Sequence, residues 1–430
     1  KMSKILPFST FAFLCLSTLH LSADGFILHQ SSSSISRITP IKTNVVCSRD
    51  NVSLFAKAKK SNKKKKKTSS VSGLKGFGSP TGEEASSINI DRSKESLDFY
   101  DFMEKHGADD TLKRVALGYF SYGKEKIRGV VALKAMKKGD VIISIPYELA
   151  VNLGAEAGDP TIPAVNLLRK YCETLTKTTS GKIDRSPYYR ILPEYMGTDC
   201  LGSTDFYSEE ALDALQSPLI TEETKTRSDN IKTMLEEDPS TLLPKTWIDG
   251  ESSITEKHLQ WATWLITSRV LTVEGGADEN VSYRLLIPFL DMCNHDRSSL
   301  HVLTGRAVPG GELKVVAGGP IQVGDQINIS YGGGMVGNDR FIQDYGFLDN
   351  EDGYQMIAEQ LIGKKKMAEG ANAGRYMSIA DRDRTMDNLR QTKMKDDIKL
   401  LEETTDASLK LAISYRLGVK KALSKFILVE

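Results

Sequence analysis

The residues best suited to chemistry lie in one stretch, residues 285–347. Its first part reads LLIPFLDMCNHD, an apolar run interrupted by Asp291, Asn294 and His295. If the surrounding apolar side chains are buried, these three polar groups need partners inside the fold. We therefore expect the polar cluster to have a specific role.

Two tyrosines follow this cluster. Residues 318–332 read as a pair of strands separated by glycine turns, and Tyr331 stands where the second strand ends. A strand end is a rigid support for a hydroxyl. A short helix is predicted over 338–347, where Tyr345 precedes a glycine, so backbone can approach a ligand closely there.

A metal site is one alternative for the polar cluster, with Asp291, His295 and His301 as ligands. The two histidines are not four residues apart, as they are when two ligands lie on one helical turn. Three ligands are also fewer than the four of a structural zinc site. Five cysteines occur without any CxxC pair, so neither a zinc cluster nor a disulfide framework is predicted. We expect no metal.

The order of four motifs carries a family resemblance: the NH of DMCNHD, the tyrosine of ISYG, Asn338, and the YGF at 345–347. Together they resemble the C-terminal half of a SET methyltransferase domain. The subgroup is the one typified by the Rubisco large-subunit lysine methyltransferase and the SET-domain actin histidine methyltransferase. The resemblance implies an α+β SET fold with short sheets and a knot-like C-terminal half. It also implies S-adenosylmethionine as cofactor and a protein substrate.

The resemblance assigns roles to individual residues. Tyr345 would place its hydroxyl nearest the transferred methyl, with Tyr331 as its catalytic partner. Asn294 and His295 would hold the adenine and the amino-acid end of the cofactor, beside an orienting carboxylate from Asp291. The implied cofactor-binding residues are Ile127, Arg128, Gly129, Ser268, Arg269, Asp291, Asn294, His295, Tyr331 and Phe347.

Short antiparallel strands are predicted over 114–146, where apolar and polar residues alternate and a turn falls at Gly123. Relatives present backbone to the cofactor here, and Gly129 matches them. Lys126 and Arg128 depart from the acidic and apolar residues that relatives place at those positions, so backbone contacts are expected rather than side-chain contacts.

A helix is predicted to begin with Ser253 and Glu256 as a capping box and to continue as HLQWATWLITSRVLT. Ser268 and Arg269 match an SR that relatives place beside the cofactor, where a guanidinium can meet the methionine carboxylate bidentately. The alternative is that Arg269 only pairs with an acid at the helix end.

The predicted organisation is a SET domain over 96–350, with a helical insertion at about 155–250, and a helical substrate-binding cap over 351–430. Tyr188, Tyr189 and Trp261 could line a substrate groove, but aromatic residues at helical spacing more often belong to the core. The cap resembles a shortened version of that of plant relatives and would be incomplete. We expect a monomer.

The first 95 residues read as a leader. Residues 1–26 have the basic and apolar segments of a signal peptide, and 27–95 are Ser-rich and basic like a plastid transit peptide. Eight lysines fall in 57–67, which suits either a solvated linker or a nuclear signal. With a net charge of +1, no nucleic-acid partner is predicted. We expect plastid import, with nucleus or cytoplasm as alternatives, and no stable membrane insertion once the leader is removed.

The predicted reaction is methyl transfer to a lysine side chain of a non-histone protein. Histidine-directed relatives lack the tyrosine of YGF, whereas this chain has both Tyr331 and Tyr345. Three alternatives stay open: a histidine methyltransferase, a nuclear, chromatin-directed methyltransferase suggested by the lysine block, and a SET-fold binding module that has lost catalysis.

Overall fold

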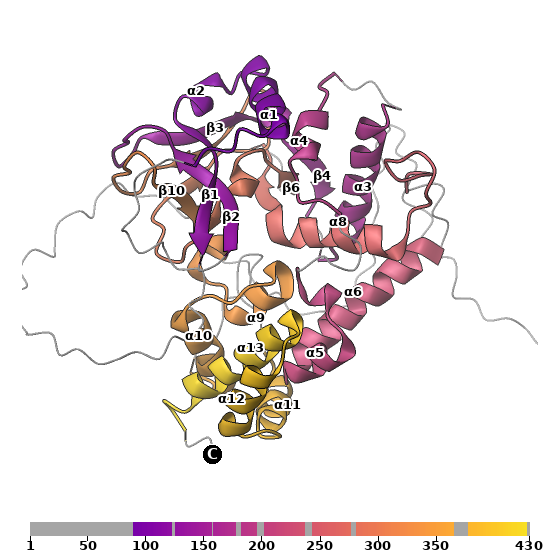
Figure 1. The fold of residues 1–430 in the computed structure, drawn as a ribbon, viewed down its shortest axis with the longest axis vertical. Coiled ribbons are helices and arrows are strands. Elements are labelled where there is room, and N and C mark those ends of the chain that lie inside the picture. The colour runs from indigo at the N-terminus through magenta and orange to yellow at the C-terminus, as the bar shows by residue number, and fades with distance from the viewer. Residues whose placement is uncertain are drawn as a thin grey trace, which may run out of the picture. The chain divides into compact units, whose positions relative to one another are not determined.

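The computed structural model describes residues 89–122, 125–156, 158–177, 182–195, 202–236, 243–276, 281–364 and 377–427. The predicted signal peptide, the predicted transit segment up to residue 88 and the turn predicted at Gly123 lie outside these residues. Within the described part of the chain, no helix has the length and apolar character needed to cross a bilayer. The described residues mix helices with small sheets, which confirms the predicted α+β class (Figure 1).

The first helix, α1 (Lys94–Lys105), begins inside the segment predicted to be leader. Ser93 caps it by accepting a hydrogen bond from the Ser96 amide. The short helix α2 (Asp109–Leu112) leads into β1 (Val115–Tyr122), which pairs along its whole length with β2 (Glu125–Ala132). These strands confirm the alternating pattern predicted there.

Three small sheets follow. The first has the order β1-β2-β10-β7, with β7 (Asn294–His295) and β10 (Gln326–Ile329) paired in parallel. The second is β3-β9-β8, made of β3 (Val141–Pro146), β9 (Glu312–Val316) and β8 (Val302–Thr304), and the third is β4-β6-β5, made of β4 (Val151–Ala155), β6 (Ser282–Leu286) and β5 (Leu271–Glu274). Of the strand pair predicted over 318–332, only β10 forms a strand, and Ile321 makes a single bridge to Met136.

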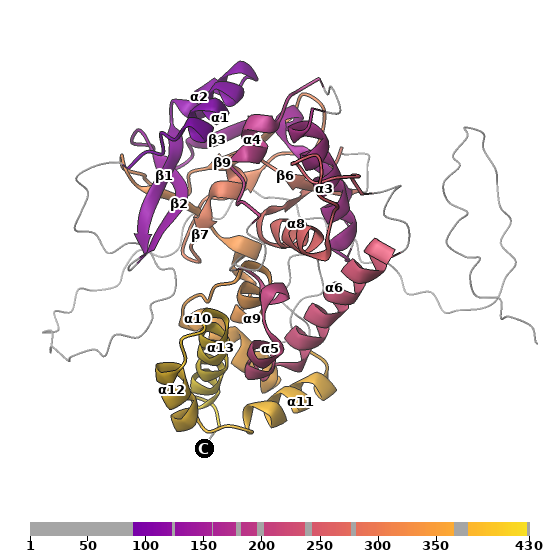
Figure 2. The same ribbon diagram turned by 45° about the vertical axis from the view of Figure 1, so that its right-hand side comes forward.

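Further helices are α3 (Thr161–Leu175), α4 (Ser186–Arg190), α6 (Pro218–Glu236) and α8 (Glu256–Arg269). Helix α3 packs against β4 and α8, and α6 packs against α8. Figure 2 shows α3 and α8 next to each other, beside the strands. Tyr188, Tyr189 and Trp261 are at most 2% exposed, so they belong to the main hydrophobic core rather than to a groove.

The capping box predicted from Ser253 and Glu256 is wrong. Helix α8 starts two residues later than that pattern implies, with Thr255 as its N-cap and His258 as the reciprocal partner. The Nδ1 atom of His258 lies 3.1 Å from the Thr255 amide and 2.9 Å from its hydroxyl. His258 is held there because its ring stacks on Trp247 at 4.2 Å, a tertiary contact that local sequence does not reveal.

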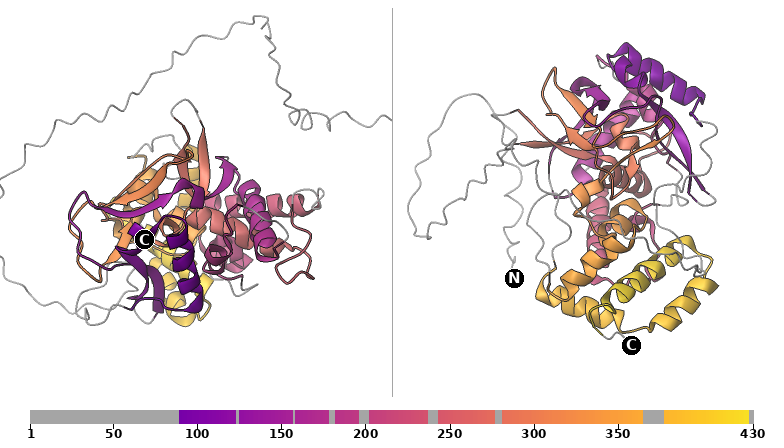
Figure 3. Two further views of the ribbon diagram at one scale, coloured as in Figure 1. Left: turned by 90° about the horizontal axis from the view of Figure 1, so that it is seen from above. Right: turned by 90° about the vertical axis from the view of Figure 1, so that its left-hand side faces the viewer.

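A second hydrophobic core lies among the C-terminal helices α10 (Glu351–Leu361), α11 (Ile379–Leu389), α12 (Met394–Glu403) and α13 (Ala407–Leu423). It includes residues of α5 (Glu209–Ala214), a helix from the predicted insertion. Figure 3 shows these helices gathered apart from the sheets. Ile342 also belongs to this second core, and it sits in the turn that carries Tyr345.

Candidate active site

A strained turn introduces the polar cluster. Phe289 has φ +67°, a conformation that costs a non-glycine residue about 1–3 kcal/mol. Its ring is fully buried and packs 5.2 Å from that of Phe99, which stabilises the turn. The short 3-10 helix η4 (Leu290–Met292) follows directly and places Asp291 at the edge of a pocket.

Asn294 connects the cluster to β2. Its side-chain amide donates a hydrogen bond to the Arg128 carbonyl at 3.1 Å. A Cβ atom at Gly129 would lie 2.8 Å from that amide and 2.7 Å from the amide nitrogen of Gln326. A side chain at position 129 would displace these two amides, so the glycine lets Asn294 reach the strand.

His295 and Tyr331 hold each other's segments in place. The Nδ1 atom of His295 accepts the backbone N–H of Tyr331 at 3.1 Å, and the Tyr331 hydroxyl donates to the Cys293 carbonyl at 2.7 Å. The Nε2 atom of His295 lies 3.6 Å from the Asp349 carboxylate. Burial alone would raise the pKa of Asp349, but contacts from His295 and Arg297 lower this pKa to about 2.

The two predicted catalytic tyrosines lie together. The rings of Tyr331 and Tyr345 stack with centroids 4.9 Å apart, and Phe347 packs edge-on to Tyr345 at 5.9 Å. Burial raises the pKa of both hydroxyls, so both stay protonated near neutral pH. Within the described part of the chain, no hydrogen bond involves the Tyr345 hydroxyl, whereas that of Tyr331 is already occupied.

The end of α8 supplies the cationic side of the site. The Ser268 hydroxyl donates to the Trp264 carbonyl at 2.6 Å, and Arg269 donates from Nη1 to the Asp291 carbonyl at 2.7 Å. Among the described residues, the buried Nε of Arg269 and both carboxylate oxygens of Asp291 have no hydrogen-bond partner. Burial raises the pKa of Asp291 to about 6, although the charge of Arg269 and the neighbouring Tyr188 hydroxyl both oppose the shift.

One pocket unites part of the predicted site. It brings together Ser268, Arg269, Asp291, Tyr331 and Tyr345. Sequence reasoning did not select the other lining residues, although Ser330 and Gly332 flank a predicted tyrosine and Leu290 precedes a predicted carboxylate. These further lining residues are Val270, Leu271, Leu290, Leu303, Ile329, Ser330 and Gly332.

The remaining predicted residues do not line this pocket: Ile127, Arg128, Gly129, Asn294, His295 and Phe347. The Arg128 guanidinium donates to the Ile191 carbonyl and lies 3.8 Å from the Met292 sulfur. Burial, together with the charge of Arg269, lowers the pKa of Arg128. The Arg128 side chain, which departs from the family pattern, therefore contacts other groups of the protein.

The described residues contain no group of three or more His, Cys, Asp or Glu side chains placed to hold a metal ion. His301, one of the three ligands considered for such a site, instead accepts the Gly318 amide on Nδ1 at 3.2 Å. His295 is likewise occupied on Nδ1 by Tyr331.

Comparison with known proteins identifies the central segment, because residues 127–332 match the family model of the SET domain. The chain contains a SET domain. Three solved structures share its fold, at 18–19% sequence identity. They are the SET domain of LSMT bound to lysine and AdoHcy (TM-score 0.51, covering 78% of this chain), the same domain bound to methyllysine and AdoHcy (0.52, 77%), and Rubisco LSMT bound to AdoMet (0.50, 77%). Each alignment covers 90% of the solved chain. A search of curated protein sequences found no match.

This result confirms the predicted SET fold. The match begins at Ile127, within β2, and ends at Gly332, directly after Tyr331. It therefore includes the NH motif and the strand-end tyrosine, while Tyr345 lies beyond it. The position of Tyr345 in the site rests on the geometry of the pocket.

Proposed function

We propose that this protein is an S-adenosylmethionine-dependent protein methyltransferase that modifies a lysine ε-amine. The observation that carries the proposal is a pocket of a SET domain that is lined both by the oppositely charged Arg269 and Asp291 and by a stacked tyrosine pair. The structural neighbours bound to AdoMet, AdoHcy, lysine and methyllysine support the same assignment.

The pocket residues fit the amino-acid end of the cofactor. A methionine moiety carries one carboxylate and one ammonium group. The unpartnered Arg269 Nε–H suits the carboxylate, and the unpartnered Asp291 oxygens suit the ammonium group. Among the described residues, no ion pair within 4.0 Å joins Arg269 to Asp291, and the protein group beside the Asp291 carboxylate is the neutral Tyr188 hydroxyl, which lowers its pKa. The carboxylate can therefore still accept a cationic group of a ligand. Asn294, which contacts the Arg128 carbonyl, would hold the strand against which the cofactor lies.

When bound, S-adenosylmethionine supplies an electrophilic methyl group on a positively charged sulfonium. A free lysine has a pKa of about 10.4, so the amine must lose its proton before it can attack. The apolar walls formed by Leu290 and Ile329 exclude water and favour the neutral amine. The Tyr345 hydroxyl accepts an N–H of this amine and orients its lone pair, while the faces of the Tyr331 and Tyr345 rings accommodate a cationic product.

Lysine is favoured over histidine because both tyrosines reach the pocket. Two hydroxyls beside an amine can accept its remaining N–H groups between successive transfers, whereas an imidazole nitrogen offers no second position for methylation. A plastid protein such as Rubisco or a sugar-phosphate aldolase is the substrate class we expect. A SET-fold binding module is the alternative, and it would bind no cofactor.

Calorimetry on the full-length protein tests the cofactor first. We expect S-adenosylmethionine to bind the wild type, and Asn294→Ala to abolish binding because the pocket loses its link to β2. Retained micromolar affinity in the variant would remove Asn294 from the site. Absence of heat with the wild type would favour the binding module.

Isotopically labelled cofactor tests the acceptor. The protein is incubated with plastid extract, and mass spectrometry locates the labelled methyl groups. Label on lysine is expected. Label found only on histidine would overturn the lysine assignment while retaining the methyltransferase.

Delivery to the plastid is a separate proposal, supported by the composition of residues 1–95. Fusion of this segment to a fluorescent protein in an algal cell tests it. Fluorescence in the nucleus would instead assign the lysine block at 57–67 as a nuclear signal.

A further inference from the structure

The turn that presents Tyr345 is unusual in its geometry. Residues Phe341–Tyr345 form one turn of π-helix, labelled η6, which ends at Gly346 with φ +79°. A Cβ atom at Gly346 would lie 2.2 Å from the Gly202 carbonyl oxygen, so the turn packs directly against another segment. Single π-turns often occur at functional sites, where they redirect a side chain.

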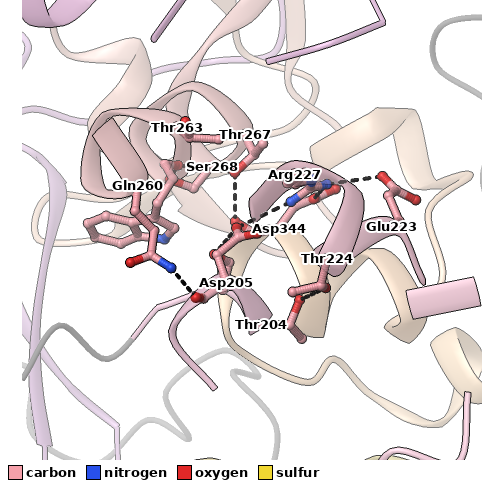
Figure 4. Close-up of polar contacts among 12 residues, drawn as sticks. Thr204, Asp205, Glu223, Thr224, Arg227, Gln260, Thr263, Thr267, Ser268 and Asp344 are labelled. Carbon is pink, nitrogen blue, oxygen red and sulfur yellow. Dashed lines mark hydrogen bonds and ion pairs between the residues drawn. The ribbon is translucent and has the colours of Figure 1, made fainter. Parts of the chain in front are cut away.

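Asp344, the residue before Tyr345, is held at both its side chain and its backbone. Its carboxylate accepts from the Arg227 guanidinium at 2.5 Å and lies 3.8 Å from Arg340. Its carbonyl lies 3.3 Å from the Thr267 hydroxyl, which the Asp344 carbonyl shares with the Trp264 carbonyl at 3.2 Å. Thr267 precedes the Ser268-Arg269 pair on α8, so the two walls of the pocket are joined through Asp344 (Figure 4).

Arg227 is the centre of this network. It lies on α6, its side chain is only 7% exposed, and it also contacts Asp205 at 3.4 Å and Glu223 at 3.1 Å. Burial alone would lower the pKa of Arg227, but the charges of Asp344, Asp205 and Glu223 raise it. Arg227 therefore stays charged and can bind the carboxylates of Asp344 and Asp205 at once.

Asp205 extends the network to the segment against which the turn packs. It lies in the 3-10 helix η3 (Thr204–Phe206), three residues after Gly202. Its carboxylate accepts from the Ser203 hydroxyl at 2.6 Å, and its carbonyl accepts from the Gln260 side chain of α8. Figure 4 shows that α8 contacts both acidic residues that Arg227 binds: Thr267 reaches Asp344, and Gln260 reaches Asp205.

We propose that Arg227 is a positioning residue for methyl transfer: by binding Asp344 and Asp205 together, it fixes the turn that points Tyr345 into the pocket. Arg227 itself does not line the pocket and need not touch substrate. The inference rests on the proposed function for its kinetic consequence, but its structural consequence can be measured without any activity.

The kinetic test compares Arg227→Gln with Arg384→Gln in the full chain. Arg384 is the matched control, because it pairs with Glu222 of the same helix α6 but is 46% exposed. We expect Arg227→Gln to lower kcat by roughly tenfold to a hundredfold with KM for S-adenosylmethionine within about twofold, since small displacements of a catalytic group have effects of this size. Arg227→Lys should recover part of the loss, and Arg384→Gln should match the wild type. Equal kcat in both glutamine variants would overturn the proposal.

A second measurement follows the Tyr345 ring itself. Fluorotyrosine is incorporated, and the ¹⁹F signal of Tyr345 is assigned by its absence in Tyr345→Phe. Because this ring stacks on Tyr331, its signal should shift in Arg227→Gln and stay in place in Arg384→Gln. An unshifted signal in Arg227→Gln contradicts the proposal.

The two measurements separate the possible failures. If the wild type methylates no protein, the proposed function fails, and the ¹⁹F signal still decides the role of Arg227. If Arg227→Gln does not fold, Asp344→Asn replaces it, because removal of Asp344 leaves two acidic side chains, Asp205 and Glu223, against Arg227 and Arg340. In Asp344→Asn, a shifted Tyr345 signal together with a reduced kcat supports the proposal. A Tyr345 signal and a kcat equal to those of the wild type overturn it.

Discussion

Two clusters of buried charged groups in this molecule differ in whether their charges have partners within the chain. Among the C-terminal helices, Asp397 accepts from Arg416 at 2.7 Å and from Lys420 at 2.7 Å, and Lys420 also donates to the carbonyl and hydroxyl of Thr392. All three charged side chains are at most 5% exposed. In the pocket, by contrast, Arg269 Nε and the Asp291 oxygens are buried with no partner among the described residues.

The presence or absence of partners within the chain distinguishes a structural charge cluster from one that binds a ligand. Buried charges cost free energy unless they are paired and hydrogen-bonded. The Asp397 cluster meets that requirement within the chain, and Arg416 also donates to the Ala214 carbonyl, which connects α13 to α5. In the Asp291 cluster, the carboxylate faces the neutral Tyr188 hydroxyl and forms no ion pair within 4.0 Å with a described cation, so a ligand of complementary charge would complete it. Changes in the first cluster should therefore affect stability, and changes in the second should affect binding.

The largest expected effect is on the C-terminal cluster. Asp397→Ala leaves two buried cations without their acid, and we expect a loss of about 3–5 kcal/mol in the free energy of unfolding. Denaturant unfolding measures it. The exposed neighbour Asp396→Ala is the control and should change this free energy by less than about 0.5 kcal/mol. A loss for Asp397→Ala no greater than for Asp396→Ala would show that the cluster is not structural.

Asp291→Asn should have the opposite effect on stability. Its folded-state pKa of about 6 lies above the ordinary 3.8, so its favourable contribution to stability is present below about pH 3.8 and is lost as pH rises through 6. At pH 8 the buried carboxylate costs up to about 3 kcal/mol, at 1.36 kcal/mol per pKa unit. We expect the variant to unfold at higher denaturant concentration than the wild type at pH 8, and at a similar concentration at pH 4. A destabilised variant at pH 8 would mean that the carboxylate is already satisfied.

The sequence predicted the parts of this comparison that depend on local pattern. The alternating strands, the helix that carries Ser268 and Arg269, and the tyrosine pair all follow from residue type, period and motif order. The Thr255 cap was missed because His258 is fixed by stacking on Trp247, a residue outside the helix. Position 227 gave no signal at all, because an arginine on a charged helix is ordinarily exposed, and only tertiary packing of η3, α6 and η6 buries it.

In the pocket, Tyr345→Phe removes one hydroxyl and little volume. We expect turnover to fall roughly a hundredfold or more, about 2.7 kcal/mol, with cofactor affinity and unfolding free energy near wild type. Tyr331→Phe provides the contrast, because it breaks the hydrogen bond to the Cys293 carbonyl and should weaken cofactor binding as well. Unchanged turnover in Tyr345→Phe would transfer the catalytic role to Tyr331.

The smallest expected effect is a pH dependence of cofactor affinity that arises from Asp291. The carboxylate must be ionised to hold an ammonium group, and its pKa in the free protein is about 6. A bound ammonium group favours the ionised form and lowers this pKa, so binding releases a proton at acidic pH. The dissociation constant should therefore rise by up to about tenfold, or 1.4 kcal/mol, for each pH unit below 6, and change little from pH 6 to 7. Calorimetry at several pH values measures this, with Asp291→Asn as the control, since an amide does not titrate and its weaker affinity should be constant over the same range. If the wild type bound equally well at pH 5 and pH 7, the Asp291 carboxylate would not contact the cofactor, and the unsatisfied charge in the pocket would need another explanation.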